Sequence, residues 1–276
     1  MTETPPNVAA GSPPLGKRLR ARGVLAVRYG LTQPVARRVP VAWAHRLHRL
    51  RRRLAPRRYT DADPLRLIEI DPARITGSVL PTAPKRPQWG RVIGGDWDRE
   101  AERFADRAVV RGVREHFEDG VPWRETALFD AFREQLSRFG NAWGYRTLDG
   151  FEPRCREIER LYTSLSTEGY RRREELTGRS RPVLLDRADE INVDVGRDGT
   201  LYWRAYGQHR LAIAQLLGLK RVPVLCHRRH RRWQARRERG RITGRFDGMA
   251  DHPDIDADTD TPSRSGRTGS SGVSSR

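Results

Sequence analysis

Cysteine is scarce in this sequence. Its 276 residues include only Cys155 and Cys226, which lie far apart and form no Cys-x-x-Cys pair. That usage excludes a disulfide-stapled scaffold and a cysteine-based zinc framework. No apolar run approaches the roughly 20 residues that a membrane-spanning helix needs, and the acidic, proline-rich start is not a signal peptide. We therefore expect a cytoplasmic protein with no transmembrane segment.

Lysine is almost absent, and one long segment contains no acidic residue. Lysine occurs only at positions 17, 85 and 220, so nearly all of the 54 basic side chains are arginines. Acidic residues are missing between Glu3 and Asp61. The net charge of +19 favours an anionic partner, such as nucleic acid, a membrane surface or a phosphorylated ligand. A GC-rich coding bias would produce the same excess of arginine without any function.

The distribution of charge divides the chain into three parts. Residues 1–60 form a basic N-terminal extension, and residues 61–226 are more apolar and balanced in charge. Residues 227–276 comprise a basic run and then an Asp-rich and Ser/Gly-rich tail, which we expect to be disordered from residue 246 onward. Amphipathic stretches within the middle part predict a helical insertion at about residues 87–150.

An amphipathic helix is predicted within the N-terminal extension, over residues 41–54. Trp43, Leu47, Leu50 and Leu54 form a narrow apolar stripe at helical spacing, and arginines occupy the other faces. One interpretation is that the stripe packs on the protein body. The others are that the helix lies on a membrane surface or clamps nucleic acid. The sequence leaves all three open.

A β-hairpin is predicted near residue 200. Ile191, Val193 and Val195 alternate with polar residues, and the pattern resumes at residues 201–203. The Asp-Gly pair at 198–199 is a common hairpin turn.

A helix and a second strand follow the hairpin. Residues 208–217 carry apolar side chains at helical spacing, Gly218 is placed to end that helix, and residues 222–226 form a short apolar run typical of a buried strand. Residues 207–210 therefore lie where a strand passes into a helix. Such a corner presents free backbone N–H groups and the positive end of the helix dipole, a geometry that binds phosphate.

This order of elements resembles the ParB/sulfiredoxin-like superfamily. ParB N-terminal domains carry a G-x-x-R motif that opens a helix, followed by Gly-Leu-x-x-(Val/Ile)-Pro-Val; here these motifs occupy residues 207–210 and 218–224. Residues 161–169 are similar to an upstream ParB helix, and residues 65–70 to the opening strand. The resemblance implies an α+β fold with a ParB/sulfiredoxin-like core, here with a helical insertion and basic, partly disordered extensions.

Departures from the superfamily narrow the functions that the resemblance implies. Sulfiredoxins have a nucleophilic cysteine where this chain has Gln208, so we exclude sulfiredoxin chemistry. ParB partition proteins continue into a helix-turn-helix and a dimerisation region, whereas an arginine run follows Cys226 here, so we do not expect chromosome partitioning. A third branch, of nucleotide-dependent serine kinases, has a similar Gly-His-His-Arg motif and implies phosphotransfer.

The corner at residues 207–210 is the candidate site. The expected phosphate-binding residues are Gly207, Gln208, His209 and Arg210. The Arg210 guanidinium would hold a phosphate through two parallel hydrogen bonds. The alternative is that Arg210 pairs with a carboxylate of the fold, Glu69 or Asp71, and only fixes the corner.

We therefore expect a domain that binds a nucleotide or another phosphorylated small molecule, either alone or with phosphotransfer or hydrolysis. The sequence identifies no cofactor; a nucleoside triphosphate with Mg²⁺ is the candidate that the kinase resemblance implies, and no metal site built from protein ligands is predicted. The pattern identifies no catalytic base. The alternative is a non-enzymatic accessory protein that binds nucleic acid, such as DNA, through its basic flanks.

Overall fold

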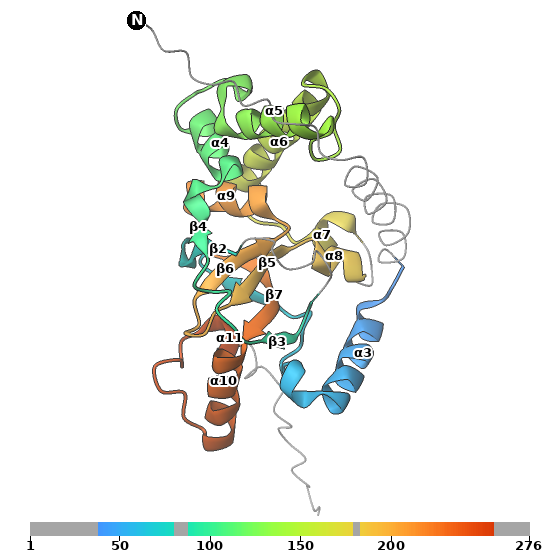
Figure 1. The fold of residues 1–276 in the computed structure, drawn as a ribbon, viewed down its shortest axis with the longest axis vertical. Coiled ribbons are helices and arrows are strands. Elements are labelled where there is room, and N and C mark those ends of the chain that lie inside the picture. Colours follow the sequence, from blue (N-terminus) through green and yellow to red (C-terminus); the bar gives the residue numbers. More distant parts are fainter. Residues whose placement is uncertain (1–37, 80–87, 179–182, 257–276) are drawn as a thin grey trace, which may run out of the picture.

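The computed structural model describes residues 38–79, 88–178 and 183–256 of the chain. It has an α+β fold built on one mixed sheet of seven strands (Figure 1). The strands are β1 Leu67–Ile70, β2 Ile75–Ser78, β3 Arg91–Ile93, β4 Glu102–Arg103, β5 Ile191–Val195, β6 Leu201–Ala205 and β7 Val222–His230.

Strand β7 organises the sheet. The strand order is β1-β7-β5-β6-β2-β4, and β3 also pairs with β7, in parallel. Strand β7 runs antiparallel to β1 and parallel to β5, while β5 and β6 form the predicted antiparallel hairpin. All nine residues of β7 are buried, and neighbouring strands pair with both of its edges. The predicted hairpin and the strand at residues 222–226 are confirmed.

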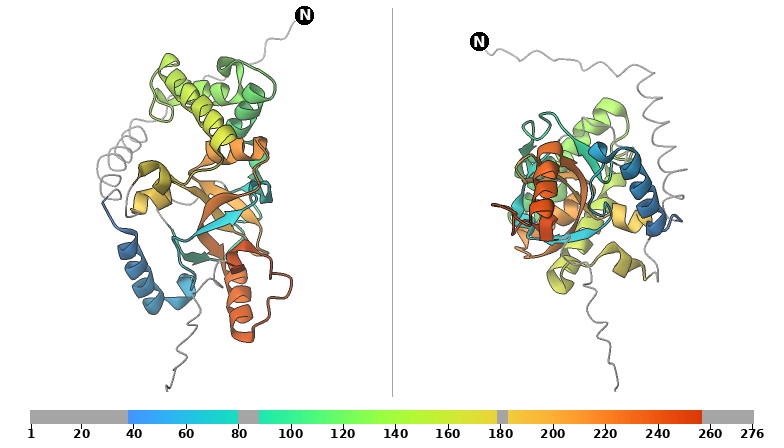
Figure 2. Two further views of the ribbon diagram at one scale, coloured as in Figure 1. Left: turned by 180° about the vertical axis from the view of Figure 1, so that it is seen from behind. Right: turned by 90° about the horizontal axis from the view of Figure 1, so that it is seen from below.

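Helices lie at both ends of this sheet (Figures 1 and 2). They are α3 Val41–Leu54, α4 Ala108–Phe117, α5 Ala127–Phe139, α6 Glu152–Glu168, α7 Arg173–Thr177, α8 Leu184–Ala188, α9 Gln208–Leu216, α10 Arg231–Thr243 and α11 Pro253–Asp256. Helices α4, α5 and α6 form a bundle beyond α9, whereas α3 and α10 lie toward the opposite end of the molecule. None of the described helices is long and apolar enough to span a membrane.

An aromatic core joins the helices of the bundle, and capping residues define the ends of α5. The rings of Phe132 and Phe151 stack with centroids 4.2 Å apart, which joins α5 to the start of α6. The Thr126 hydroxyl caps α5 by accepting a hydrogen bond from the Phe129 N–H, and Gly140, with φ of 66°, ends that helix. The bundle is thereby fixed above α9, where the candidate site lies.

The predicted boundaries of the helical insertion need correction. Strands β3 and β4 both fall within residues 87–150, so the helical part begins later, at the short 3-10 helix Phe104–Asp106. Strands of two or three residues are too short for their alternation to stand out in a sequence.

The C-terminal part is also more ordered than predicted. Residues 227–230 complete β7, and Arg228 and Arg229 are buried there. The Arg228 Nε donates to Asp194 at 2.6 Å, and Arg229 donates to Asp254. Asp254, within the tail predicted to be disordered, is 1% exposed. Residues 257–276 of that tail, like residues 1–37 of the N-terminal extension, lie outside the described residues.

Candidate functional site: a cleft at the start of helix α9

The corner between β6 and α9 has a left-handed backbone. Tyr206 has φ of 56° and Gly207 has φ of 62°, and α9 begins at Gln208 as predicted. A Cβ on Gly207 would lie 2.7 Å from Ile191 Cγ1 and 2.8 Å from Ile191 Cα, so only glycine fits this position without strain. No side chain caps α9. The first N–H groups of the helix therefore remain open, at the positive end of its dipole.

Arg210 points away from this open end and is held by the fold. Its Nη1 donates to Glu190 Oε2 at 2.8 Å and to the Tyr170 hydroxyl at 2.9 Å, and its Nη2 donates to the Asp189 carbonyl oxygen. The Glu190 side chain is 1% exposed and also accepts from Tyr170 and from the Arg173 N–H. Arg210 thus ties the start of α9 to the residue that precedes β5.

The proposed acidic partners of Arg210 were wrong. Glu69 pairs with Arg172 at 2.6 Å, and Asp71 accepts a hydrogen bond from the Ala73 N–H, which caps a short 3-10 helix. The carboxylate beside Arg210 is Glu190, because the chain enters β5 next to the first turn of α9.

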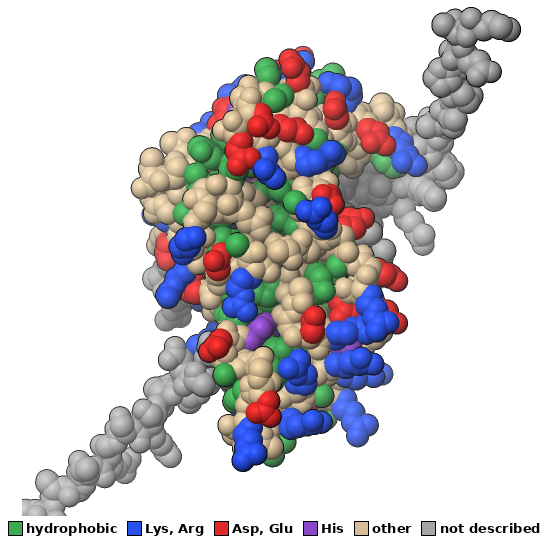
Figure 3. All heavy atoms as spheres, turned by 90° about the vertical axis from the view of Figure 1, so that its left-hand side faces the viewer, with side chains coloured by type: hydrophobic (Ala, Val, Ile, Leu, Met, Phe, Trp, Pro, Cys, Tyr) green, Lys and Arg blue, Asp and Glu red, His purple; other side chains and the backbone are tan. Residues whose placement is uncertain are grey.

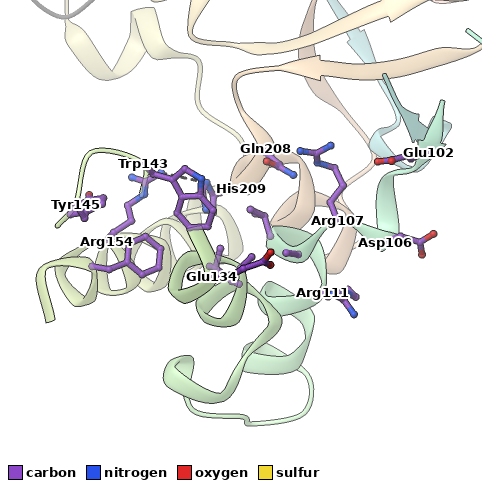
Figure 4. Close-up of a pocket in the computed structure, with 15 residues that line it drawn as sticks. Glu102, Asp106, Arg107, Arg111, Glu134, Trp143, Tyr145, Arg154, Gln208 and His209 are labelled. Atoms are coloured by element: carbon purple, nitrogen blue, oxygen red, sulfur yellow. Dashed lines mark hydrogen bonds between the residues drawn. The ribbon is translucent and has the colours of Figure 1, made fainter. Parts of the chain in front are cut away.

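A cleft of about 850 Å³ lies between the start of α9 and the helical bundle (Figure 4). Gln208 and His209 line it from α9, so two of the four predicted site residues face this space. Three groups of side chains complete its charged and aromatic lining: the basic Arg107, Arg111 and Arg154, the acidic Glu102, Asp106 and Glu134, and the aromatic Trp143, Tyr145 and Phe151. The cleft has the size of a small-molecule binding site.

Two buried donors in the cleft lack partners. Among the described residues, nothing forms a hydrogen bond with Gln208 Nε2 or Arg107 Nε, although both atoms are buried. Figure 4 shows the two side chains close together at one end of the cleft. The Arg107 guanidinium lies 4.6 Å from the Trp203 ring centroid. Burial lowers the pKa of Arg107, with Glu102 opposing that shift. Buried donors are normally satisfied, and a turn of either side chain toward the cleft would bring its donor to a ligand that carries acceptor oxygens.

His209 contributes hydrogen bonding and no charge. Burial, and then the nearby charge of Arg154, lower the pKa of His209 to about 3. Its Nδ1 lies 3.4 Å from Arg154 Nη2, and Figure 4 shows the two side chains together. The ring is therefore neutral at physiological pH. The formal cations of the cleft are its three arginines.

Trp143 presents an aromatic ring beside these groups. It lies in the loop before α6 with φ of 52°, and its side chain is 44% exposed. The Phe132 and Phe151 rings support it, with centroids 5.6 and 5.4 Å away. Backbone strain of this kind is often retained at ligand sites. Sequence patterns did not indicate this residue, because a tryptophan in a loop has no periodic spacing.

The described residues contain no cluster of metal-ligating side chains. Across residues 38–79, 88–178 and 183–256, no group of three or more His, Cys, Asp or Glu side chains is placed to hold a metal ion.

Comparison with known proteins adds no relative. The chain matches no protein-family model, no curated protein and no solved structure. The geometry of the cleft is therefore the basis for a functional proposal.

Proposed function

We propose that this protein binds a nucleotide or another phosphorylated small molecule in the cleft at the start of α9. The observation that carries the proposal is the uncapped start of α9 beside the buried, unpartnered Gln208 Nε2 and Arg107 Nε. A phosphate would accept from the open backbone N–H groups, and from these two donors once their side chains turn toward the cleft. The α+β fold and the residues 207–210 motif, which resembles the ParB/sulfiredoxin-like superfamily, support the same proposal.

The charge of the cleft favours a phosphate carried with a cation. Three arginines face three carboxylates, so the lining has no large excess of positive charge. A nucleoside triphosphate bound with Mg²⁺ brings a smaller net negative charge than the free nucleotide does. The carboxylates of Glu102, Asp106 and Glu134 would lie near the cation or its waters, and they are the groups available as a base for phosphotransfer or hydrolysis.

The aromatic lining favours a nucleotide over a bare phosphate. The half-exposed Trp143 ring lies on the same side of the cleft as His209 and Arg154 (Figure 4). A base stacked on an indole typically contributes about 1–3 kcal/mol of binding free energy. We therefore assign the base to the Trp143 end and the phosphates to the Gln208 end.

Arg154 lies at the Trp143 end, where it would donate to an acceptor of the base or the sugar. Replacing Arg154 with glutamine is expected to weaken binding of Mg²⁺–nucleoside triphosphate by about ten- to a hundredfold, since a hydrogen bond from a charged donor contributes about 1.5–3 kcal/mol. Arg154 otherwise pairs only with the exposed Glu157 and approaches His209, so the melting temperature should change little. Isothermal titration calorimetry, after a thermal-shift screen of nucleotides and sugar nucleotides, measures the affinity.

The matched control is Arg133→Gln. Arg133 is an exposed arginine of α5 that pairs with Asp130 and does not line the cleft, so this variant should bind like the wild type. Equal loss in both variants would indicate non-specific attraction and would contradict a site in the cleft.

The alternative function, nucleic-acid binding, rests on α10. Figure 3 shows basic side chains gathered over the lower part of one face, at the level of this helix. The exposed arginines of α10 include Arg231, Arg232, Arg236 and Arg239. However, Arg228, Arg229 and Arg237 are buried in ion pairs, which leaves fewer cations for phosphates than the sequence indicated. A wild type that binds duplex DNA with a steep salt dependence, and binds no nucleotide, would favour this alternative.

A further inference from the structure

Helix α3 is attached to the body through a polar face. His48, 8% exposed, lies with its Nε2 3.0 Å from the Thr60 carbonyl oxygen. On the same face, His45 Nδ1 lies 3.1 Å from Asp63 Oδ1, and Arg52 Nη1 lies 3.8 Å from an oxygen of Asp61. These contacts fix which side of α3 faces the protein.

The apolar side of α3 faces outward. Trp43, Leu47, Leu50 and Leu54, which we call the α3 stripe, are 64%, 47%, 52% and 78% exposed. The interpretation that the stripe packs on the protein body is therefore wrong, because the histidine face makes that contact. At 3.6 residues per turn the four side chains span about 60° of the helix circumference, roughly opposite His45 and Arg52. The helix would lie flat on any apolar surface that the stripe entered.

Arginines border the α3 stripe. Arg46, Arg49 and Arg53 line a hollow of about 390 Å³ together with Leu50. At 3.6 residues per turn, Arg51 falls on the other side of the stripe. Within the described part of the chain, these four guanidinium groups form no ion pair. The nearest acidic residues in the sequence are Glu3 and Asp61. An exposed apolar stripe bordered by cations is complementary to a surface that has an apolar interior and an anionic outer layer.

We propose that α3 docks on an anionic lipid surface. The α3 stripe would enter the boundary between headgroups and acyl chains, and the flanking arginines would lie at the level of the lipid phosphates. Figure 1 places α3 at the edge of the molecule, away from the bundle and α9, so docking would leave the cleft open.

Two other occupants fit this face less well. Nucleic acid would engage the arginines but would leave three leucines and a tryptophan in water. A second copy packed through the same stripe would bring the arginines of both helices together around a two-fold axis, and like charges at that spacing repel. A lipid surface satisfies both the apolar and the charged groups.

The test is cosedimentation of the full chain with phosphatidylcholine vesicles, with and without phosphatidylglycerol. We expect binding that requires the anionic lipid and weakens with salt. The double variant Leu47→Glu with Leu50→Glu should lose at least about tenfold in affinity, because both apolar contacts are lost and charge is reversed. Arg46→Gln with Arg53→Gln should lose about tenfold or more and flatten the salt dependence.

The control variant is Ile242→Glu, which alters an isoleucine of α10 that is 86% exposed. It should bind vesicles like the wild type, and all three variants should keep the wild-type melting temperature because the altered side chains are in solvent.

Four results would overturn the proposal: no vesicle binding by the wild type; equal binding by the Leu47→Glu/Leu50→Glu variant; a dimer that this variant converts to monomer, in place of vesicle binding; or vesicle binding only after removal of residues 1–37, which would mean that this segment covers the stripe in the full chain.

Discussion

Arg210→Ala is expected to lower the free energy of unfolding by about 3–5 kcal/mol, the usual cost of breaking a buried ion pair by removing one partner. The Arg210 side chain is 16% exposed and Glu190 is 1% exposed, so truncation leaves a carboxylate in the interior without its cation. The Tyr170 hydroxyl and the Arg173 N–H still donate to Glu190, but neither group offsets its charge. Urea denaturation of the full chain measures the change.

A double-mutant cycle provides the control. Replacing both partners, as Arg210→Met with Glu190→Met, removes the buried charge altogether and should recover much of the stability that Arg210→Ala loses. A structural role for Arg210 would be contradicted by an Arg210→Ala protein that unfolds like the wild type and has lost nucleotide binding. It would restore Arg210 as the phosphate ligand that the sequence motif suggested.

Asp254→Asn is expected to have a similarly large effect on stability, again about 3–5 kcal/mol. The Asp254 carboxylate accepts from Arg229 Nε at 2.9 Å and from Trp233 Nε1 at 2.8 Å, and Arg237 Nη1 lies 3.3 Å from it. Arg229, Arg237 and Asp254 are each at most 2% exposed. Removing the Asp254 charge leaves the buried Arg229 beside a neutral amide and leaves Arg237 with the more distant carboxylate of Asp61, 3.9 Å away. Thermal or urea denaturation reports the loss.

Acid should weaken the same cluster in the wild type. Burial by itself raises the pKa of Asp254, but Arg229 and Arg237 outweigh it and hold that pKa below its ordinary value near 3.8. Burial also raises the pKa of Asp61, but Arg237, Gln234 and other partners outweigh it and lower that pKa to about 2. The unfolded chain therefore binds more protons than the folded one between about pH 4 and pH 2, and stability falls as the pH drops through that range. This fall should be shallower in Asp254→Asn.

Truncation tests whether Asp254, and not the rest of the C-terminal tail, provides this stability. Removing residues 257–276 keeps the contacts of Asp254 with Arg229, Trp233 and Arg237, so it should not reproduce the instability of Asp254→Asn. Removing residues 247–276 also removes Asp254 and should reproduce the instability of Asp254→Asn. Equal melting temperatures for the two truncated chains would contradict a structural role for Asp254.

Local patterns in the sequence were sufficient to predict the centre of the fold. Alternation on both sides of the Asp-Gly turn identified the hairpin of β5 and β6, and apolar spacing after Gly207 identified α9. These features depend on neighbours within a few residues, so a single sequence reveals them. The same holds for the amphipathic pattern of α3, although not for the face by which α3 docks.

Contacts between distant segments were not predictable in this way. Glu190 reaches Arg210 only because β5 begins beside α9, and a charge pattern cannot show which carboxylate arrives there. The run after Cys226 looks solvent-exposed in sequence, yet Arg229 is buried because Asp254 folds back onto it. Gln208 and His209 were correctly placed at the corner, but the cleft that they face is completed by Arg107 and Arg154 from the helical bundle.

The affinity of Gln208→Glu for Mg²⁺–nucleoside triphosphate, measured by calorimetry, tests most directly whether the start of α9 binds phosphate. A carboxylate in the first turn complements the helix dipole, typically by about 0.3–1 kcal/mol, so the variant should melt no earlier than the wild type. The same carboxylate would repel a phosphate at the open N–H groups, and we predict at least a tenfold loss of affinity, with Ile242→Glu as the remote control that retains binding. A Gln208→Glu protein that binds the nucleotide as tightly as the wild type would contradict the proposed site.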